Sequence, residues 1–441
     1  MKRSLYNIII PYRNVNIIYN TLWNTSAITG KSRQEINDLL NRCSLAEGGC
    51  CVDNNIQSLF TSRKFIVDEE VDEKAYVREK LYATNHNAEL LDIIVVPTLA
   101  CNFRCWYCYE DHGDKTRISK NEVDNIVKFV GRRLAEDKRI KKVSLSFFGG
   151  EPFLCYDSVM LPLLEQVHAL CESRNISFTA SATTNASLIS EKRLAQLRPH
   201  KWDFMQVTLD GNKNRHDKVR FSAQGKGSYD LIVTNVLIAL RYGIRIMLRI
   251  NVSEETNLAV EQLLQRFDKL SETERKLLTF QIQRVWQSPK EVDQTISLIV
   301  RKIRLADFKC KSIYSTPLSI WNTCYADKEN EIVVNPRGEI YKCTARDFSK
   351  GQVEGMLTTE GTIVWNELHE KRKSLSPLNN EVCSKCSILP ICVGGCSQKL
   401  LEGEHGRCPQ FFTDGEKIDY ALMVYLEKVR LKALNKCHTL K

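Results

Sequence analysis

The chain has 441 residues, of which 43% are hydrophobic and 26% charged, the composition of a soluble globular protein. This length exceeds one ordinary hydrophobic core, so we expect one large domain with smaller ones attached. No apolar run reaches the roughly 20 residues that span a bilayer. The short Ile8–Ile10 run near the start is interrupted by Pro11. We therefore expect no membrane segment, no signal peptide and a cytoplasmic protein.

The formal charge is +10, from 63 basic and 53 acidic residues, but the basic residues are scattered and form no long block. This pattern favours an ordinary solvated surface over a nucleic-acid-binding one. The cysteine count is more informative, because 17 is an odd number in a chain for which we expect no export. Disulfides are therefore not expected, and metal ligation or redox chemistry is favoured.

Residues 1–90 predict a small α+β module. The expected strands are Tyr6–Ile10, Val15–Tyr19 and Lys64–Val67, and the expected helices are Gln34–Asn41 and Ile56–Leu59. Such a module buries little by itself. It serves either as a cap on the next domain or as a peptide-binding element that holds an extended segment along an open strand edge.

Residues 91–309 alternate between apolar strands and amphipathic helices. The expected strands are Asp92–Pro97, Lys142–Phe148, Ser177–Thr183, Phe204–Leu209, Arg245–Val252 and Leu278–Val285. The expected helices are Asn121–Leu134, Ser158–Cys171, Glu191–Leu197, Tyr229–Tyr242, Leu258–Leu270 and Val292–Leu305. Six such units predict an α/β fold with a parallel sheet, a partial (β/α)6 TIM-like barrel. Functional groups then belong at the C-terminal ends of the strands.

Residues 310–412 combine short strands, loops and clustered cysteines, and residues 413–441 contain a closing helix expected at Asp414–Leu434. A loop-rich region of this kind has little apolar core. We expect it to need bound metal to hold its shape.

Three cysteines follow the first barrel strand within eight residues: Cys101, Cys105 and Cys108. A [4Fe–4S] cluster usually takes four thiolates, so three leave one iron open to a small chelating molecule. The rival interpretation is a zinc knuckle, which usually pairs its cysteines as CxxC and needs a fourth ligand that is absent locally.

This CxxxCxxC spacing resembles the signature of radical S-adenosylmethionine (SAM) enzymes. The resemblance implies that the three cysteines bind a [4Fe–4S] cluster and that SAM chelates its fourth iron. It also places Tyr107 near the adenine. In this family one electron from the cluster cleaves SAM, and the resulting 5′-deoxyadenosyl radical abstracts a hydrogen atom from the substrate.

Further segments at strand ends resemble the SAM-contacting motifs of that family. The resemblance implies cofactor-binding roles for Gly149, Gly150, Glu151 and Pro152 of a GGEP motif, for Thr184 and Asn185, for Thr208, and for Arg220. Glu151 is expected to accept the SAM ammonium, and Arg220 to pair with the SAM carboxylate. Ala186 stands where relatives carry glycine. Asp210 is a candidate catalytic residue that contacts substrate or ribose, or else part of an Asp-Gly turn.

A second cysteine array resembles the SPASM extension of radical SAM enzymes that modify peptides. The resemblance implies two auxiliary [4Fe–4S] clusters, one on Cys383, Cys386, Cys392 and Cys408, the other on Cys324, Cys343 and Cys396. Position 330, where some relatives supply a further cysteine, is Asn330. That cluster therefore has an open iron, or borrows Cys310 or Cys437. Both clusters could instead be purely structural.

The order of the regions resembles maturases of ribosomally made peptides, and more weakly the darobactin synthase type. We therefore predict an oxidoreductase that binds a precursor peptide through its leader segment and installs a Trp-centred carbon–carbon or ether crosslink. A flavodoxin or ferredoxin-type protein would donate electrons. The alternatives are thioether (sactionine-type) crosslinking, oxidation of the anaerobic sulfatase-maturase kind and, more distantly, a zinc-containing nucleic-acid-binding protein. We expect no nucleic-acid or membrane partner.

Overall fold

The structure is a computed structural model and describes residues 1–45, 53–253, 260–285, 287, 292–311, 317–348, 350–403 and 407–438. Its chain forms two compact units. The larger unit comprises Asn87–Ile313 and Glu329–Glu370, and the smaller comprises Met1–His86, Tyr314–Lys328 and Lys371–Lys441. These units group residues by packing. The module boundaries expected from the sequence divide the chain by function instead. The two units do not test them, so they stay a prediction.

The larger unit is built on an 11-stranded sheet. Its parallel strands are β6 (Leu90–Val95), β8 (Lys142–Phe147), β9 (Ser177–Thr184), β10 (Trp202–Thr208), β12 (Arg245–Val252), β13 (Leu278–Arg284) and β14 (Lys309–Lys311). Because neighbours in the sheet are also neighbours in the sequence, each helix returns the chain to the next strand. The expected partial barrel is confirmed.

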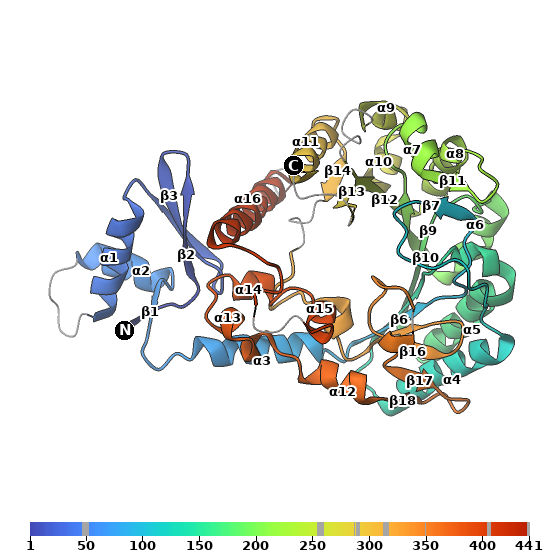
Figure 1. The fold of residues 1–441 in the computed structure, drawn as a ribbon, viewed down its shortest axis with the longest axis horizontal. Helices are drawn as coiled ribbons and strands as arrows, with labels where there is room; N and C mark the ends of the chain where they lie inside the picture. Colours follow the sequence, from blue (N-terminus) through green and yellow to red (C-terminus); the bar gives the residue numbers. More distant parts are fainter. Residues whose placement is uncertain are drawn as a thin grey trace. The chain divides into compact units, whose positions relative to one another are not determined.

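Helices cover the outer side of this sheet (Figure 1). They are α4 (Lys120–Glu136), α5 (Leu161–Glu172), α6 (Glu191–Leu197), α7 (Lys213–Val219), α8 (Tyr229–Arg241), α9 (Val260–Gln265), α10 (Glu272–Leu277) and α11 (Val292–Leu305). A single helix was expected over Leu258–Leu270, but α9 ends at Gln265. The chain turns before Ser271 starts α10 with a capping box to Glu274.

The sheet continues beyond β6 with strands from the C-terminal third of the chain. Parallel β15 (Glu331–Val334) pairs with β6, and β16 (Glu339–Tyr341), β17 (Gly355–Leu357) and β18 (Ile363–Trp365) follow as an antiparallel meander. This pairing places Cys343, just after β16, in the larger unit.

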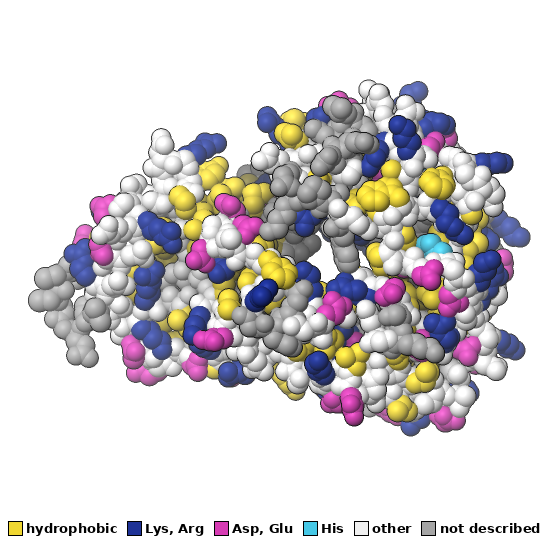
Figure 2. Space-filling model, in the orientation of Figure 1, with side chains coloured by type: hydrophobic (Ala, Val, Ile, Leu, Met, Phe, Trp, Pro, Cys, Tyr) yellow, Lys and Arg dark blue, Asp and Glu magenta, His cyan; other side chains and the backbone are white. Residues whose placement is uncertain are grey.

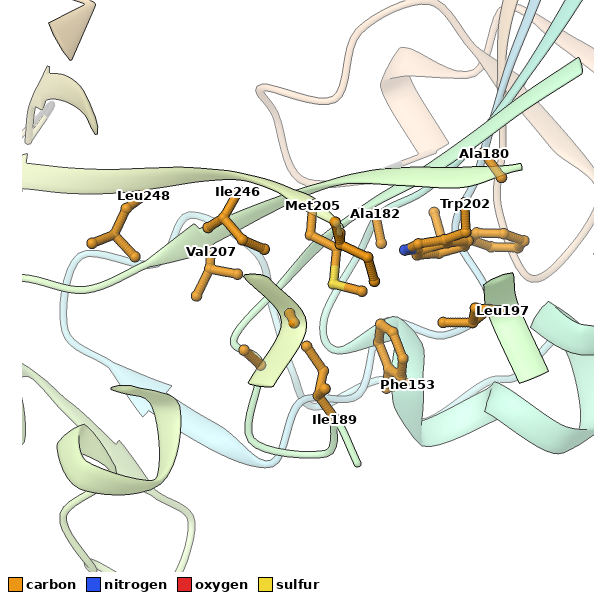
Figure 3. Close-up of a cluster of buried hydrophobic side chains, with 14 of the residues drawn as sticks. Phe153, Ala180, Ala182, Ile189, Leu197, Trp202, Met205, Val207, Ile246 and Leu248 are labelled. Carbon is orange, nitrogen blue, oxygen red and sulfur yellow. The ribbon is translucent and has the colours of Figure 1, made fainter. Parts of the chain in front are cut away.

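Aromatic side chains fill one part of the core behind the sheet. Figure 3 shows Phe153 near Leu197, Met205 and Trp202. The Phe153 and Trp202 rings meet edge to face, with centroids 6.3 Å apart. Ala180 of β9 is only 1% exposed and small enough to leave room for these rings. Phe153 thereby anchors the segment that directly follows Glu151.

The smaller unit contains a three-stranded antiparallel sheet, β2 (Asn7–Tyr12), β3 (Val15–Asn20) and β4 (Thr25–Thr29), together with the short pair β1 (Lys2–Arg3) and β5 (Ile66–Val67). Its N-terminal helices are α1 (Arg33–Leu45), α2 (Asn54–Ser62) and α3 (Glu73–Asn85). Strands and helices were expected here, but β4 and α3 were not. Their sequences, TSAIT and EKAYVREKLYATN, lack strong periodicity.

The N-terminal strands pack against the cysteine-rich C-terminal segment in the same unit. That segment contains α13 (Glu381–Ser384), α14 (Leu389–Cys392), α15 (Ser397–Leu401) and the expected closing helix, α16 (Asp414–His438). Helix α12 (Glu367–Ser374) precedes it, and the division between the two units falls within this helix, after Glu370. One apolar cluster joins Ile10 and Ile17 of the sheet to Ile391 of α14 and Val424 of α16. This burial is the main force that holds the unit together.

No helix among the described residues is long and apolar enough to cross a membrane. On the face drawn in Figure 2, lysine and arginine side chains alternate with acidic ones and do not gather in one patch.

Candidate active site

The cysteine loop follows β6 and is held by a short ladder. Strand β7 (Phe103–Cys105) pairs antiparallel with β11 (Arg220–Ser222), and Cys105 lies directly opposite Arg220. Two segments more than 100 residues apart are therefore fixed in register. Their pairing brings the guanidinium of a buried arginine, 8% exposed, to the cysteine loop.

Burial raises the pKa of all three thiols, that of Cys101 to about 12. Thiolates at these positions therefore need a bound metal to stabilise them. No three His, Cys, Asp or Glu side chains among the described residues lie close enough to hold one metal ion. A four-iron cluster takes its thiolates on separate irons, so its ligands need not converge on a point.

The hydroxyl of Tyr107 is the centre of a buried polar network. It donates to Asp210 Oδ2, and it accepts from Arg220 Nη1 at 2.8 Å and from Asn251 Nδ2 at 3.1 Å. The other Asp210 oxygen accepts from the Asn251 backbone N–H at 2.8 Å. Arg249 Nε donates to the Asn251 amide oxygen at 2.8 Å. The ends of β10 and β12 thus lock the aromatic residue between the cysteines.

Burial shifts the acid–base properties of this network. It raises the pKa of Asp210, against the opposing effect of Arg220, and raises that of Tyr107 well above its usual value. Tyr107 is therefore a neutral phenol that donates its proton to Asp210, as the hydrogen-bond geometry also requires.

A buried histidine connects the same strand ends. Burial lowers the pKa of His216 well below its usual value, so the ring is neutral. Its Nδ1 accepts from the Asp210 backbone N–H at 3.2 Å, so the proton is on Nε2, which donates to Ser228 Oγ at 2.9 Å. Ser228 Oγ in turn donates to the Arg220 carbonyl at 2.9 Å. His216 therefore positions the backbones of Asp210 and Arg220.

Glu151 is fully buried and connects the GGEP segment to the end of β9. Its Oε1 accepts from Thr184 Oγ1 at 2.8 Å and from the Phe153 N–H at 3.1 Å, and its Oε2 accepts from the Asn185 N–H at 2.8 Å. The Asn185 side chain then donates to Asn102 at 2.8 Å and approaches Cys101 Sγ at 3.9 Å. Glu151 thus fixes an amide that contacts a cysteine sulfur.

The glycines before Glu151 make room for the cysteine loop. Gly149 has φ +105°, and a Cβ there would lie 2.8 Å from the Thr98 carbonyl oxygen. A Cβ on Gly150 would clash with the Ala100 carbonyl. Pro152 starts the short helix that carries Phe153. These residues permit close backbone packing. The SAM contacts expected of Gly149, Gly150 and Pro152 stay a prediction.

Thr208 ends β10 opposite Arg249 and is buried. Asn251, Arg249 and Asn102 were not among the site residues expected from the sequence. Asn251 and Arg249 could have been found, because polar residues at the end of an apolar strand lie at the C-terminal edge of the barrel.

Four cysteines of the second array lie together in the smaller unit. Burial raises the pKa of Cys383 to about 11 and of Cys392 to about 12, and the thiols of Cys386 and Cys408 lie close enough to add to both shifts. Of the other predicted set, Cys324 and Cys396 belong to the smaller unit and Cys343 to the larger.

Among the remaining cysteines, Cys43 is buried in the core of the smaller unit. Cys155, Cys171 and Cys310 are part of the barrel core. Asn330, which stands where some relatives supply a further cysteine, accepts a hydrogen bond from Arg133 at 2.8 Å within the larger unit. Cys50, Cys51 and the side chain of Cys437 lie outside the described residues.

Residues 95–267 match the model of the Radical SAM superfamily. The chain therefore carries a radical SAM domain, which binds S-adenosylmethionine and a [4Fe–4S] cluster, and it is a radical SAM enzyme.

A curated relative with an assigned activity is the cysteine-type anaerobic sulfatase-maturating enzyme of Clostridium novyi (strain NT). It is 24% identical over 340 residues, covering 69% of this chain and 87% of the relative. Two solved structures share the fold. Native anSMEcpe with bound AdoMet has a TM-score of 0.59 and 18% identity, over 80% of this chain and 100% of that one. Streptococcus suis SuiB bound to precursor peptide SuiA has a TM-score of 0.54 and 15% identity, over 94% and 98%.

Proposed function

We propose that this enzyme is a peptide maturase that installs an intramolecular crosslink in a ribosomally made precursor. The observation that carries the proposal is the combination of a radical SAM domain with a separate three-stranded module, β2–β4, in one chain. The match to anSMEcpe covers 100% of that chain and 80% of this one. The match to peptide-bound SuiB covers 94% of this chain. A separate module of this kind favours a substrate that must be recognised away from the reacting residues.

Strand β4 supplies the binding edge in this proposal. Its single neighbour among the described strands is β3, because the sheet order is β2-β3-β4. Ile28 of β4 is 62% exposed. A leader segment that pairs with this edge gains main-chain hydrogen bonds, and an exposed Ile28 gains an apolar partner. Tethering the leader raises the effective concentration of the core residues at the active site.

The site residues fit the cofactor pair. Cys101, Cys105 and Cys108 supply three thiols for the cluster, and Arg220 Nε is a buried donor with no partner among the described residues. An anionic group such as the SAM carboxylate would satisfy that donor. Cluster and SAM, when bound, supply the 5′-deoxyadenosyl radical that removes a hydrogen atom from the substrate.

The chain's own residues position that chemistry. Tyr107, held by Asp210 and Asn251, presents its ring beside the cofactor site, and Thr208 lies at the same strand end. Glu151 orients Asn185 and accepts the SAM ammonium. Asp210 holds Tyr107 through Oδ2 and accepts from the Asn251 backbone N–H through Oδ1. The catalytic role predicted for Asp210 stays a prediction.

Crosslinking removes two hydrogens from the peptide for each new bond. One leaves as a hydrogen atom to the 5′-deoxyadenosyl radical. The other leaves as a proton together with one electron, which an auxiliary cluster held by Cys383, Cys386, Cys392 and Cys408 would accept. A second auxiliary cluster on Cys324, Cys343 and Cys396 would bring the total, together with the SAM-binding cluster, to three. A flavodoxin or ferredoxin-type donor reduces the enzyme.

Mass spectrometry of a precursor peptide co-expressed with the enzyme tests this function. Loss of two hydrogens per link supports a carbon–carbon or thioether crosslink, and an added oxygen supports an ether. Fragmentation locates the joined residues and shows whether a tryptophan or a cysteine takes part. An unmodified precursor, in the presence of active SAM cleavage, would refute the maturase proposal.

A second candidate is oxidation of a cysteine or serine in a protein substrate, as in sulfatase maturation. The similarity to the Clostridium novyi enzyme over 87% of its length favours it. An aldehyde in a co-expressed sulfatase would support this candidate, and it would leave the N-terminal module without a role.

A further inference from the structure

Tyr6, just before β2, has a buried hydroxyl without a hydrogen-bond partner among the described residues. The residue is 1% exposed, and its ring packs with Val77 and Leu81 of α3. A buried donor left unpaired costs free energy, so such a group in a native protein calls for an explanation. A ligand that binds next to it can supply the missing acceptor.

The predicted auxiliary-cluster cysteines lie in the same packing cluster as Tyr6. Cys383 is part of that cluster, and Cys386 packs against it. The Cys386 thiol is near enough to act electrostatically on the Tyr6 hydroxyl. The nearby carboxylate of Glu73 already accepts from Ser4 Oγ at 2.5 Å and from the Leu5 N–H at 2.8 Å.

The cysteine loop is also tied to the N-terminal strands by direct bonds. Thr21 Oγ1 donates to the Ser387 carbonyl at 2.6 Å, and the Thr21 N–H donates to the Tyr6 carbonyl at 3.0 Å. Ser387 directly follows Cys386 in the sequence. The two bonds connect the backbone of Tyr6 through Thr21 to the residue next to the cysteine.

We propose that the Tyr6 hydroxyl donates a hydrogen bond to an inorganic sulfide of the cluster beside Cys386, so that the N-terminal module tunes the auxiliary cluster. The inference rests on the proposed assignment of a cluster to Cys383, Cys386, Cys392 and Cys408. Reduction adds negative charge to such a cluster. A donor to its sulfur stabilises the reduced state and raises the reduction potential. Tyr6 is thus a positioning and tuning residue and does not touch the substrate.

The test is Tyr6→Phe in the full-length, anaerobically reconstituted enzyme, because this change removes one O–H and keeps the ring. Redox titration followed by electron paramagnetic resonance measures the midpoint potential. The signal of this cluster is identified by its loss in Cys408→Ala. We expect a lower potential with unchanged iron and sulfide content. Proton double resonance of the wild type should show an exchangeable proton coupled to this cluster, absent in Tyr6→Phe.

Tyr19→Phe is the matched control. Tyr19 is equally buried in the same module, but its hydroxyl accepts from Lys428 Nζ at 3.0 Å and donates to Asn24 Oδ1 at 3.1 Å. Its removal should leave the potential unchanged. An unshifted potential in Tyr6→Phe, an equal shift in Tyr19→Phe, or no exchangeable proton in the wild type would overturn the inference. A wild-type protein without this cluster would instead refute the cluster assignment in the proposed function.

Discussion

At the scale of single residues, the site depends on buried polar side chains whose hydrogen bonds have little redundancy. Arg220 illustrates this, because one arm of its guanidinium holds Tyr107 and its Nε is left for a ligand. The planar fork of arginine serves both partners at once, and an ammonium cannot.

Arg220→Lys keeps the charge and loses this geometry. Hydrogen bonds to charged groups contribute roughly 1.5–3 kcal/mol, so we expect SAM cleavage to fall about 10- to 100-fold. The rate of 5′-deoxyadenosine formation under dithionite measures it. Arg245→Lys is the control, since Arg245 is exposed and pairs with Asp203. Equal activity of Arg220→Lys and wild type would contradict the assigned role.

Ala186, which stands where relatives carry glycine, has φ +62°. Cβ crowding in this region costs roughly 1–2 kcal/mol, and the added freedom of an unfolded glycine offsets roughly 0.4–1 kcal/mol. The glycine also loses the buried methyl of Ala186, at a cost of roughly 0.8 kcal/mol, so we expect Ala186→Gly to change the free energy of unfolding by no more than about 1 kcal/mol. Chemical denaturation measures the change. Ala182→Gly, in the regular part of β9, should be destabilising. A loss of stability in Ala186→Gly as large as that in Ala182→Gly would show that the turn does not strain alanine.

At the scale of elements, strand β4 is an edge of its three-stranded sheet and is less buried than β2 and β3. Burying a side chain such as Ile28 contributes roughly 1.5–3 kcal/mol. Ile28→Asp should therefore weaken leader-peptide binding by about 10- to 100-fold. Fluorescence anisotropy with a labelled leader measures the affinity.

Peptide-independent SAM cleavage should be unchanged in Ile28→Asp, because β4 belongs to a different compact unit from the SAM site. Leu59→Asp on α2 is the matched control, since Leu59 is also exposed, at 41%, and lies outside the sheet. Undiminished binding by Ile28→Asp would exclude β4 as the docking edge.

At the scale of the whole molecule, iron is expected in both compact units. Alanine at Cys101, Cys105 and Cys108 together should remove one of three clusters, leaving about two-thirds of the iron, and should abolish SAM cleavage. Iron and sulfide analysis measures the first effect, and 5′-deoxyadenosine formation the second.

Alanine at Cys383, Cys386, Cys392 and Cys408 is the counterpart. It should also leave about two-thirds of the iron, yet retain SAM cleavage, because the SAM-binding cysteines belong to the other unit. Complete iron loss in either variant would show that the clusters do not assemble independently.

The sequence by itself determined the parts of this protein that depend on local pattern. Short strand patterns that alternate with amphipathic helices predicted the six barrel strands, because such β–α alternation is typical of a parallel sheet. The spacing of Cys101, Cys105 and Cys108 indicated the chemistry, because ligands within eight residues of one loop can meet without help from the rest of the fold.

Only the tertiary structure decided how distant residues combine. It joined Tyr107 to Asp210 and Asn251, paired β15 with β6, and packed Tyr6 with Cys383 and Cys386. Hydrogen bonds depend on distances of a few tenths of an ångström between segments hundreds of residues apart. No local pattern encodes such distances, because they result from how the whole core packs.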